Sequence, residues 1–161
     1  MCIRDSHKCV RVVTNIPITV GKGLTGIAWG ENLTNDQKQF TKKLFENTSK
    51  IYEFTEDYLD IFLAMTSSGP AIIALIIEAL SDGGLSGGLP KILSEELIME
   101  MMLGTISLIK ENQLTPSELK NLVTSPGGTT ISALRVLEKK SIRSALIESI
   151  VSASNRSKEF N

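Results

Sequence analysis

The chain has 161 residues, the length of one domain on the usual scale of ~100–200 residues per domain. Its 17 basic and 18 acidic residues give a net charge of −1, and this balance argues against a protein of nucleic acids or of membrane surfaces, which would need a basic excess. Hydrophobic residues make up 42% of the chain, enough for a folded core, and aromatic residues only 5%, so we expect an aliphatic core.

The chain has one histidine and two cysteines, and this scarcity excludes several kinds of site. Histidine triads, His-rich zinc sites and CxxC redox pairs all need residues that the sequence lacks. We therefore expect no metal site, and we assign structural or incidental roles to His7 and Cys9. The cysteines suggest no disulfide framework, which is typical of a cytoplasmic protein.

The first six residues, Met1–Ser6, do not match an expected start for the hydrophobic strand that follows. Reverse-translated, they read like the end of a transposase sequencing adapter carried into a reading frame. We therefore expect residues 1–6 to be an artefact that should be left out of fold reasoning, and the natural chain to begin upstream. No signal peptide is expected, because no apolar stretch follows a basic start.

Residues 10–54 are expected to form short strands and one helix, the end of an α/β unit. The helix is predicted over 35–47, with Thr34 as its cap and with Phe40, Leu44 and Phe45 on one face. The expected extended segments are Val10–Val13, Ile18–Val20, Gly26–Trp29 and Lys50–Phe54.

From about residue 57 onward the pattern is helical. Pro70 is expected to start a helix over Ala71–Leu80, which is apolar almost all round, as in a helix buried on every side. We expect this helix to be too short, and too interrupted by Glu78 and glycines, to span a membrane. Pro90 is expected to open the next helix, to about Lys110, with a methionine run that fills gaps in the core.

Three further helices are expected towards the C-terminus. The first begins at a capping box, Thr115–Glu118, with proline at the first helical position. Ser125–Gly128 ends it, and the next two helices carry Ile131–Leu137 and Ile142–Val151. Lys139 and Lys140 are interpreted as solvated charges at a helix C-terminus.

The apolar helix 71–80 has too few neighbours in so short a chain to be covered on all sides. A second copy of the chain could supply the missing cover. We therefore expect an obligate homodimer with an extensive apolar interface, or a higher homo-oligomer.

Two glycine motifs have different interpretations. Gly21–Gly26 spells GxGxxG, but a dinucleotide fingerprint needs a strand before it and a helix that begins within it. Here a strand and a turn are expected to follow, so this motif is not interpreted as a nucleotide site.

The second motif, Thr124–Thr130, joins two helices, and the second helix is expected to start at or just after Gly128. Glycine lets the backbone approach a ligand, and a helix N-terminus favours an anion. Hydroxyl groups of Ser125, Thr129 and Thr130 add donors, so the turn could hold a small carboxylate or phosphate. The alternative is a plain helix–helix turn with Thr129 as the cap.

Several stretches of the chain share one resemblance. They are Arg11–Pro17, Ser68–Ala71, Glu78–Gly84, Gly88–Pro90 and Leu119–Thr130. Together they resemble pyrroline-5-carboxylate reductase, and the Thr-Ser-Pro-Gly-Gly-Thr-Thr run is highly specific in this context. The resemblance covers essentially residues 10–160.

The resemblance implies an enzyme of proline biosynthesis that reduces 1-pyrroline-5-carboxylate to L-proline with a hydride from NADPH or NADH. It implies a mainly α fold, in which a helical dimerisation domain follows a truncated remnant of a Rossmann-type α/β domain. The expected domains are the artefact 1–6, the Rossmann remnant 7–55 and the dimerisation and substrate-binding domain 56–161. The family's own GxGxxG is missing from this chain, so we expect the chain itself to be an inactive fragment.

The resemblance also gives roles to individual residues. Backbone N–H groups around Gly128 and Thr129 would hold the substrate carboxylate, and the Thr130 hydroxyl, as the catalytic group, would bond the ring nitrogen. Ser125 would line the same pocket, and Glu56 would contact substrate unless it is a solvated acid. Ser68 would approach the site or cap a helix.

Two other functions remain open. The chain could be a non-catalytic helical dimerisation module, or a small-carboxylate-binding protein that uses the same turn. No nucleic acid or membrane partner is expected on any of these interpretations.

Overall fold

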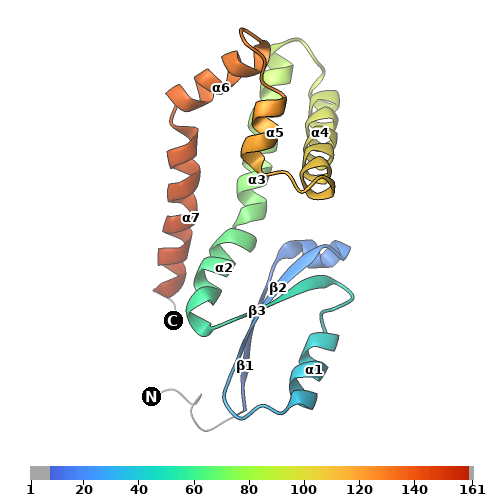
Figure 1. Cartoon of the computed structure of the whole chain (residues 1–161), viewed down its shortest axis with the longest axis vertical. Coiled ribbons are helices and arrows are strands. Elements are labelled where there is room, and N and C mark those ends of the chain that lie inside the picture. The colour runs from blue at the N-terminus through green and yellow to red at the C-terminus, as the bar shows by residue number, and fades with distance from the viewer. Residues whose placement is uncertain (1–7, 160–161) are drawn as a thin grey trace. The chain divides into compact units, whose positions relative to one another are not determined.

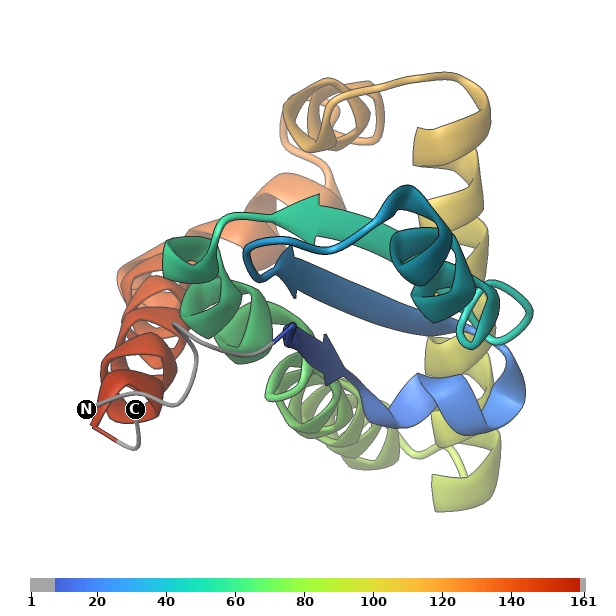
Figure 2. The ribbon, with the colours of Figure 1, turned by 90° about the horizontal axis from the view of Figure 1, so that it is seen from below.

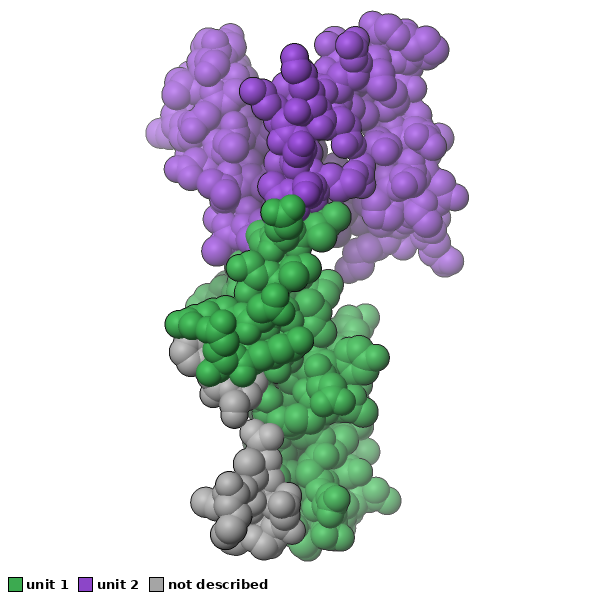
Figure 3. Space-filling view, turned by 90° about the vertical axis from the view of Figure 1, so that its left-hand side faces the viewer, with its two compact units in different colours: residues 1–70, 147–161 green, residues 71–146 purple. Residues whose placement is uncertain are grey.

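The structure, a computed structural model, describes residues 8–159. The expected artefact 1–6 and His7 lie outside the described residues. Two compact units are present: residues 1–70 together with 147–161, and residues 71–146 (Figure 3). The expected fold class, mainly α with a small α/β part, is confirmed, whereas the expected domain limits 7–55 and 56–161 stay a prediction.

A small sheet forms the centre of the first unit (Figure 1). Strand β1 (Val10–Thr14) pairs antiparallel with β2 (Gly23–Trp29), and β2 pairs parallel with β3 (Ser49–Phe54). Parallel neighbours need a crossover connection, and helix α1 (Asn35–Lys43) supplies it between β2 and β3. Figure 2 shows the three strands side by side.

The strand expected at Ile18–Val20 is wrong, because Ile16–Val20 is the 3₁₀ helix η2. Pro17 has no N–H for a sheet, and its fixed φ suits a tight helical turn, which Gly21 closes at φ +69°. The GxGxxG motif behaves as interpreted. Gly23 and Gly26 lie in the extended strand β2, and no helix begins among them.

Helix α1 has the predicted cap. The Thr34 hydroxyl accepts a hydrogen bond from the Gln37 N–H, and the Gln37 side chain accepts one from the Thr34 N–H, at 3.3 and 3.0 Å. The helix ends at Lys43, four residues before the expected end at Asn47. Its predicted apolar face stays uncovered within the chain, since Phe40 is 65% exposed.

Helix α2 (Leu59–Thr66) packs on β2 after the one-turn 3₁₀ helix η3 (Glu56–Tyr58). Leu59 and Phe62 are buried, and a Cβ at Gly26 would lie 2.8 Å from the Phe62 ring, so the strand needs glycine there. At the other end of α2, the Asn15 side chain donates to the Thr66 carbonyl (3.0 Å) and accepts from the Leu24 N–H (2.8 Å).

Helices α3 (Gly69–Ser86) and α4 (Lys91–Glu111) are the long helices of the chain. They approach closely where the Ser94 hydroxyl donates to the Ser81 carbonyl at 2.8 Å, with both serines buried. Ser94 also lies against Gly84.

Helix α3 is longer than expected and is not covered by this chain. Ile73, Leu75 and Leu80 are 49, 64 and 41% exposed. The helical segment Glu56–Ser86 is long and apolar enough to cross a membrane by length and composition alone, so the expectation that it is too short is wrong. The core helix of a soluble protein passes the same test. The methionine run does not fill a core within this chain either, because Met99 and Met101 are 46 and 48% exposed.

Three helices complete the chain: α5 (Pro116–Leu122), α6 (Thr129–Lys139) and α7 (Ile142–Lys158). The capping box predicted for α5 is present, since the Glu118 carboxylate accepts from the Thr115 N–H at 2.7 Å and the Thr115 hydroxyl accepts from the Glu118 N–H at 3.2 Å. Lys139 is exposed in the last turn of α6, as expected for a solvated charge at a helix C-terminus.

Candidate functional site

The turn between α5 and α6 has a form dictated by its sequence. The Gly128 N–H donates to the Ser125 carbonyl at 3.1 Å, and Gly127 has φ +69°. Proline at the second position of a turn and a positive φ at the third define a type II β-turn. Pro126 and Gly127 are therefore the residues that this turn needs, and the turn brings the chain directly into α6.

The N-terminus of α6 lacks a side-chain cap. Gly128 is the N-cap residue, so the interpretation of Thr129 as the cap is wrong: Thr129 is already the first helical residue. The first helical bond runs from the Ser132 N–H to the Gly128 carbonyl (3.3 Å), which leaves the N–H groups of Thr129, Thr130 and Ile131 ahead of it. Because glycine has no side chain to accept them, these donors and the positive end of the helix dipole are available to an anion.

The Ser125 hydroxyl lies directly beside this helix end. A Cβ added at Gly128 would lie 2.4 Å from Ser125 Oγ, so any side chain at Gly128 would displace the hydroxyl. Ser125 and Thr129 are exposed, and Gly128 and Thr130 are half-buried. Four of the five predicted substrate-binding residues, Ser125, Gly128, Thr129 and Thr130, therefore meet in one turn.

The fifth, Glu56, belongs to the other compact unit and is an ion-pair partner. Its Oε1 accepts from Arg11 Nη1 at 2.8 Å, and Arg11 Nη2 also donates to Asp60 at 3.4 Å. The Glu56 hydrogen bond raises the pKa of the Arg11 guanidinium. Asp60 in turn accepts from the Ser157 hydroxyl of α7 at 2.8 Å. Glu56 thus has a structural role in joining β1 to η3, and its contact with substrate stays a prediction.

Ser68 is half-buried between α2 and α3, and its backbone N–H donates a hydrogen bond to the Leu63 carbonyl at 3.4 Å. Its neighbour Ser67 donates its hydroxyl to the Thr14 carbonyl at 3.1 Å, which fastens this break to the end of β1. The place of Ser68 near a substrate stays a prediction.

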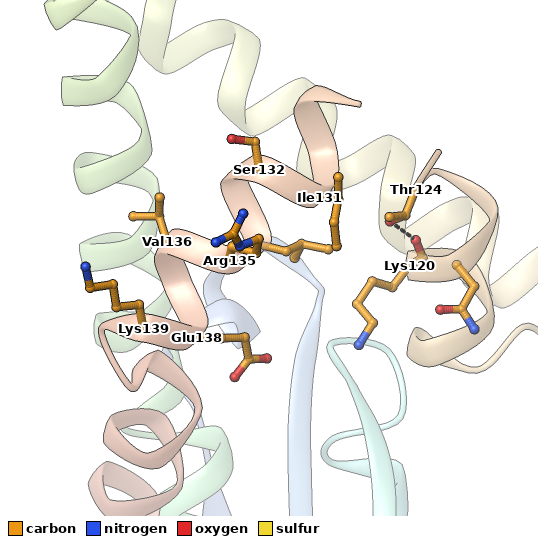
Figure 4. A pocket seen from close by; sticks show the side chains of 10 residues that line it. Lys120, Thr124, Ile131, Ser132, Arg135, Val136, Glu138 and Lys139 are labelled. Atoms are coloured by element: carbon orange, nitrogen blue, oxygen red, sulfur yellow. Dashed lines mark hydrogen bonds between the residues drawn. The ribbon is translucent and has the colours of Figure 1, made fainter. Parts of the chain in front are cut away.

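A cleft of about 650 Å³ lies between α5 and α6, next to the turn (Figure 4). None of the five predicted residues lines it. Lys120 and Arg135, which sequence reasoning passed over, enter it from the two helices, and Glu138 on its wall is held by Arg143 at 2.8 Å. For Arg135, the signal in the sequence was its spacing from Lys139, because residues one helical turn apart share a face of α6, here the face towards α5.

The Gly21–Gly26 motif does not have the geometry of a dinucleotide fingerprint. In Gly21–Gly26 the backbone passes from a 3₁₀ turn into a strand, and the amide cradle of a helix N-terminus is not formed. Among residues 8–159, no group of three His, Cys, Asp or Glu side chains could hold a metal.

Comparisons with known proteins agree with this fold. The family model of the pyrroline-5-carboxylate reductase dimerisation domain matches residues 56–160. A pyrroline-5-carboxylate reductase of Synechocystis is 43% identical over 154 residues, which are 96% of this chain and 58% of that protein. A pyrroline-5-carboxylate reductase of Glycine max is 38% identical over a stretch that covers 97% of this chain and 57% of that protein.

Two solved structures are similar throughout the chain. The Plasmodium falciparum pyrroline carboxylate reductase with NADP bound superposes with a TM-score of 0.92 at 31% identity, covering 96% of this chain and 62% of that one. The pyrroline-5-carboxylate reductase of Coxiella burnetii has a TM-score of 0.86 at 35% identity, covering 94% and 57%. The chain spans somewhat more than half the length of these relatives. Because the family model matches well over half of the chain, the chain belongs to the pyrroline-5-carboxylate reductase family and carries its dimerisation domain.

Proposed function

We propose that the protein of which this chain is part reduces 1-pyrroline-5-carboxylate to L-proline with a hydride from NADPH or NADH. The observation that carries the proposal is the N-terminus of α6, where Gly128 leaves three backbone N–H groups without a side-chain acceptor. The curated relatives are reductases of this name, and the turn has the sequence that resembles the family signature. Because the Gly21–Gly26 motif does not form a dinucleotide cradle, the roles proposed below concern the substrate alone.

The Gly128 N–H, expected from the resemblance to help hold the carboxylate, already donates to the Ser125 carbonyl at 3.1 Å within the turn. In the proposed complex, the substrate carboxylate therefore accepts hydrogen bonds from the N–H groups of Thr129 and Thr130. The positive end of the α6 dipole adds to this attraction. In the same complex we assign the bond to the ring nitrogen to the hydroxyl of the half-buried Thr130. Ser125, whose Oγ lies beside Gly128, would border the same space. Holding the ring in one orientation speeds the reaction, because the bound substrate has already lost the translational and rotational freedom that it would otherwise lose on reaching the transition state.

The carboxylate site can be tested on this chain by recording amide NMR spectra during titration with L-proline. We expect the resonances of Thr129, Thr130 and Ile131 to shift. Prolinamide, which has the same ring without a carboxylate, should leave them unmoved. Shifts that are equal with both ligands, or that occur elsewhere in the chain, would show that the α6 N-terminus does not hold the carboxylate.

The catalytic role of Thr130 needs a protein that includes the cofactor half. There, Thr130→Ala should lower kcat by about 10²-fold or more, as expected for loss of a group that positions or transfers a proton, and should leave assembly intact. Thr105→Ala, a matched change on α4 away from the turn, should leave kcat unchanged. For the chain as given, we propose that it shows no turnover, and pyrroline-dependent oxidation of NADPH by the purified chain would contradict this.

A homodimer or higher homo-oligomer is the proposed assembly, and the cytoplasm the proposed location. The matched family model describes a dimerisation domain, and the exposed apolar residues of α3 supply a surface for it. The alternative, a non-catalytic dimerisation module, is supported by the match of residues 56–160 to a dimerisation model. On that alternative, a protein that includes the cofactor half would assemble equally well with and without Thr130→Ala, and both forms would oxidise NADPH at the same rate in the presence of 1-pyrroline-5-carboxylate.

A further inference from the structure

We propose that the cleft between α5 and α6 binds a small organic anion that carries at least two negative charges, as a phosphate ester or a dicarboxylate does. The cleft has a volume of about 650 Å³, which is the size of a small-molecule pocket. Lys120 on α5 and Arg135 on α6 line its two walls (Figure 4). All of its lining residues belong to the compact unit 71–146, and the inference rests neither on the reductase reaction nor on the homodimer proposed above.

The two walls of the cleft are held in place by the fold. Leu119 of α5 is buried, and the Thr124 hydroxyl, at the end of the same wall, donates to the Lys120 carbonyl at 2.6 Å. The type II turn that follows fixes the direction in which the chain enters α6. The backbone that carries Lys120 and Arg135 is therefore set before a ligand arrives, and this reduces the conformational freedom that binding must remove.

The cleft offers a ligand more positive than negative charge. Within the described part of the chain, neither Lys120 nor Arg135 makes an ion pair, and Lys139 brings a third cation to the α6 wall. Glu138, the acid among the lining residues, accepts a hydrogen bond at 2.8 Å from Arg143, which does not line the cleft. That bond is the main cause that lowers the pKa of Glu138, and the charge of Lys120 adds to it. The Lys120 ammonium on α5 therefore acts across the cleft on α6.

This charge decides the chemistry of the occupant. An apolar surface that covered Lys120 and Arg135 would remove water from two cations without replacing it, which is costly. An anion instead replaces that water with charge-assisted hydrogen bonds, and the planar guanidinium of Arg135 matches the paired oxygens of a phosphate or carboxylate group. Cations on two facing walls favour an anion with two negative charges over one with a single charge.

The rest of the lining fits an organic molecule better than a bare inorganic ion. Ile131, Leu134 and Val136 give the α6 wall apolar side chains beside the cations. The Asn121 side-chain amide and the Ser132 hydroxyl also line the cleft, and neither makes a hydrogen bond to another of the described residues. A few polar groups among apolar side chains are the usual lining of a site for a small organic ligand.

The test measures the binding of inorganic pyrophosphate, succinate and acetate to the full chain by isothermal titration calorimetry at one ionic strength. Pyrophosphate or succinate should bind at least about tenfold more tightly than acetate, and the tighter of the two identifies the ligand as a phosphate or a dicarboxylate. Arg135→Gln and Lys120→Gln should each weaken that binding by about tenfold. Lys110→Gln, the matched loss of an exposed cation on α4 outside the cleft, should change the dissociation constant less than about twofold.

Amide NMR spectra of the unaltered chain locate the ligand without any substitution. The tighter-binding dianion should shift the resonances of Lys120 and Arg135, and L-proline should not displace it, because the carboxylate donors proposed above lie at the N-terminus of α6. Glu138→Gln should tighten binding by about two- to threefold, since it removes a negative charge from the wall.

Three results would overturn the inference. The first is equal binding of all three anions, or an equal loss of binding with Lys110→Gln, which would show attraction to the surface as a whole. The second is a ligand that shifts Thr129 and Thr130 alone and is displaced by L-proline, which would place it at the end of α6. The third is a chain that binds none of the anions while Arg135→Gln weakens its self-association, which would assign the cleft to acidic groups of a second copy.

Discussion

Two adjacent glycines in α3 should respond to alanine in opposite directions. A Cβ at Gly84 would lie 2.0 Å from Ser94 Oγ and 3.2 Å from Ser94 Cβ, whereas a Cβ at Gly83 would meet nothing within 4 Å. Ser94 is only 2% exposed, and its hydroxyl bonds the Ser81 carbonyl at 2.8 Å. Gly84→Ala therefore forces Ser94 to turn away from Ser81 or forces α3 and α4 apart.

The magnitude follows from these contacts. Losing the Ser94 hydrogen bond costs about 1 kcal/mol, and overpacking a tight contact costs about 1–3 kcal/mol. The better helix propensity of alanine returns up to about 1 kcal/mol. Gly84→Ala should thus lower the free energy of unfolding by about 1–3 kcal/mol, whereas Gly83→Ala should raise it by about 0.5–1 kcal/mol.

Urea denaturation followed by circular dichroism measures both free energies, at one protomer concentration because assembly contributes to stability. Ser94→Ala in the Gly84→Ala background removes the hydroxyl that clashes with the new methyl group. Ser94→Ala should therefore lower the free energy of unfolding less in this background than in the wild type. If Gly84→Ala were as stable as Gly83→Ala, α3 and α4 would not cross at Gly84, and the packing described here would be wrong.

Three further predictions concern the turns and caps. Gly127→Ala should destabilise by about 1–2 kcal/mol in urea denaturation because Gly127 has φ +69°, and Gly127→Asn should cost less, since asparagine tolerates this region; equal costs would contradict the type II turn. The pKa of the Glu118 carboxylate is lowered, mainly by the hydrogen bond that it accepts from the Thr115 backbone N–H. This carboxylate therefore stabilises the folded state at pH values above its ordinary pKa, and the stabilisation is lost as the pH falls through the lowered pKa. The urea midpoint of the wild type should therefore fall more on acidification below about pH 4 than that of Glu118→Gln, and parallel pH profiles would refute the linkage. Asn15→Leu should cost about 2–4 kcal/mol because it leaves the Leu24 N–H and the Thr66 carbonyl without their partner, and unchanged thermal unfolding would show that other groups satisfy them.

Local signals in the sequence predicted local structure well. The cap at Thr34 and the capping box at Thr115 are formed as predicted, because each involves residues only three apart. Gly128 was predicted to lie at the start of α6, and it is the N-cap. The alternative interpretation, with Thr129 as the cap, missed by one residue, since the type II turn closes on Gly128 and leaves no room for a side chain there.

Errors arose where a local pattern had two readings. Ile18–Val20 is β-branched and suits a strand, but Pro17 and the Asn15 carbonyl, which accepts from the Ile18 N–H, commit it to a 3₁₀ turn. The methionine run of α4 suits a core, but Met99 and Met101 are 46 and 48% exposed among the described residues.

The sequence by itself determined where most helices begin, that the GxGxxG motif starts no helix, and that α3 is too apolar for one copy to cover. These follow from hydrogen bonds, backbone angles and side-chain periods that act within a few residues. Only the tertiary structure decided that Arg11 binds Glu56 and that Gly84 meets Ser94. Arg11 and Glu56 are 45 residues apart, and no local pattern encodes such a contact, because it depends on how already formed elements pack.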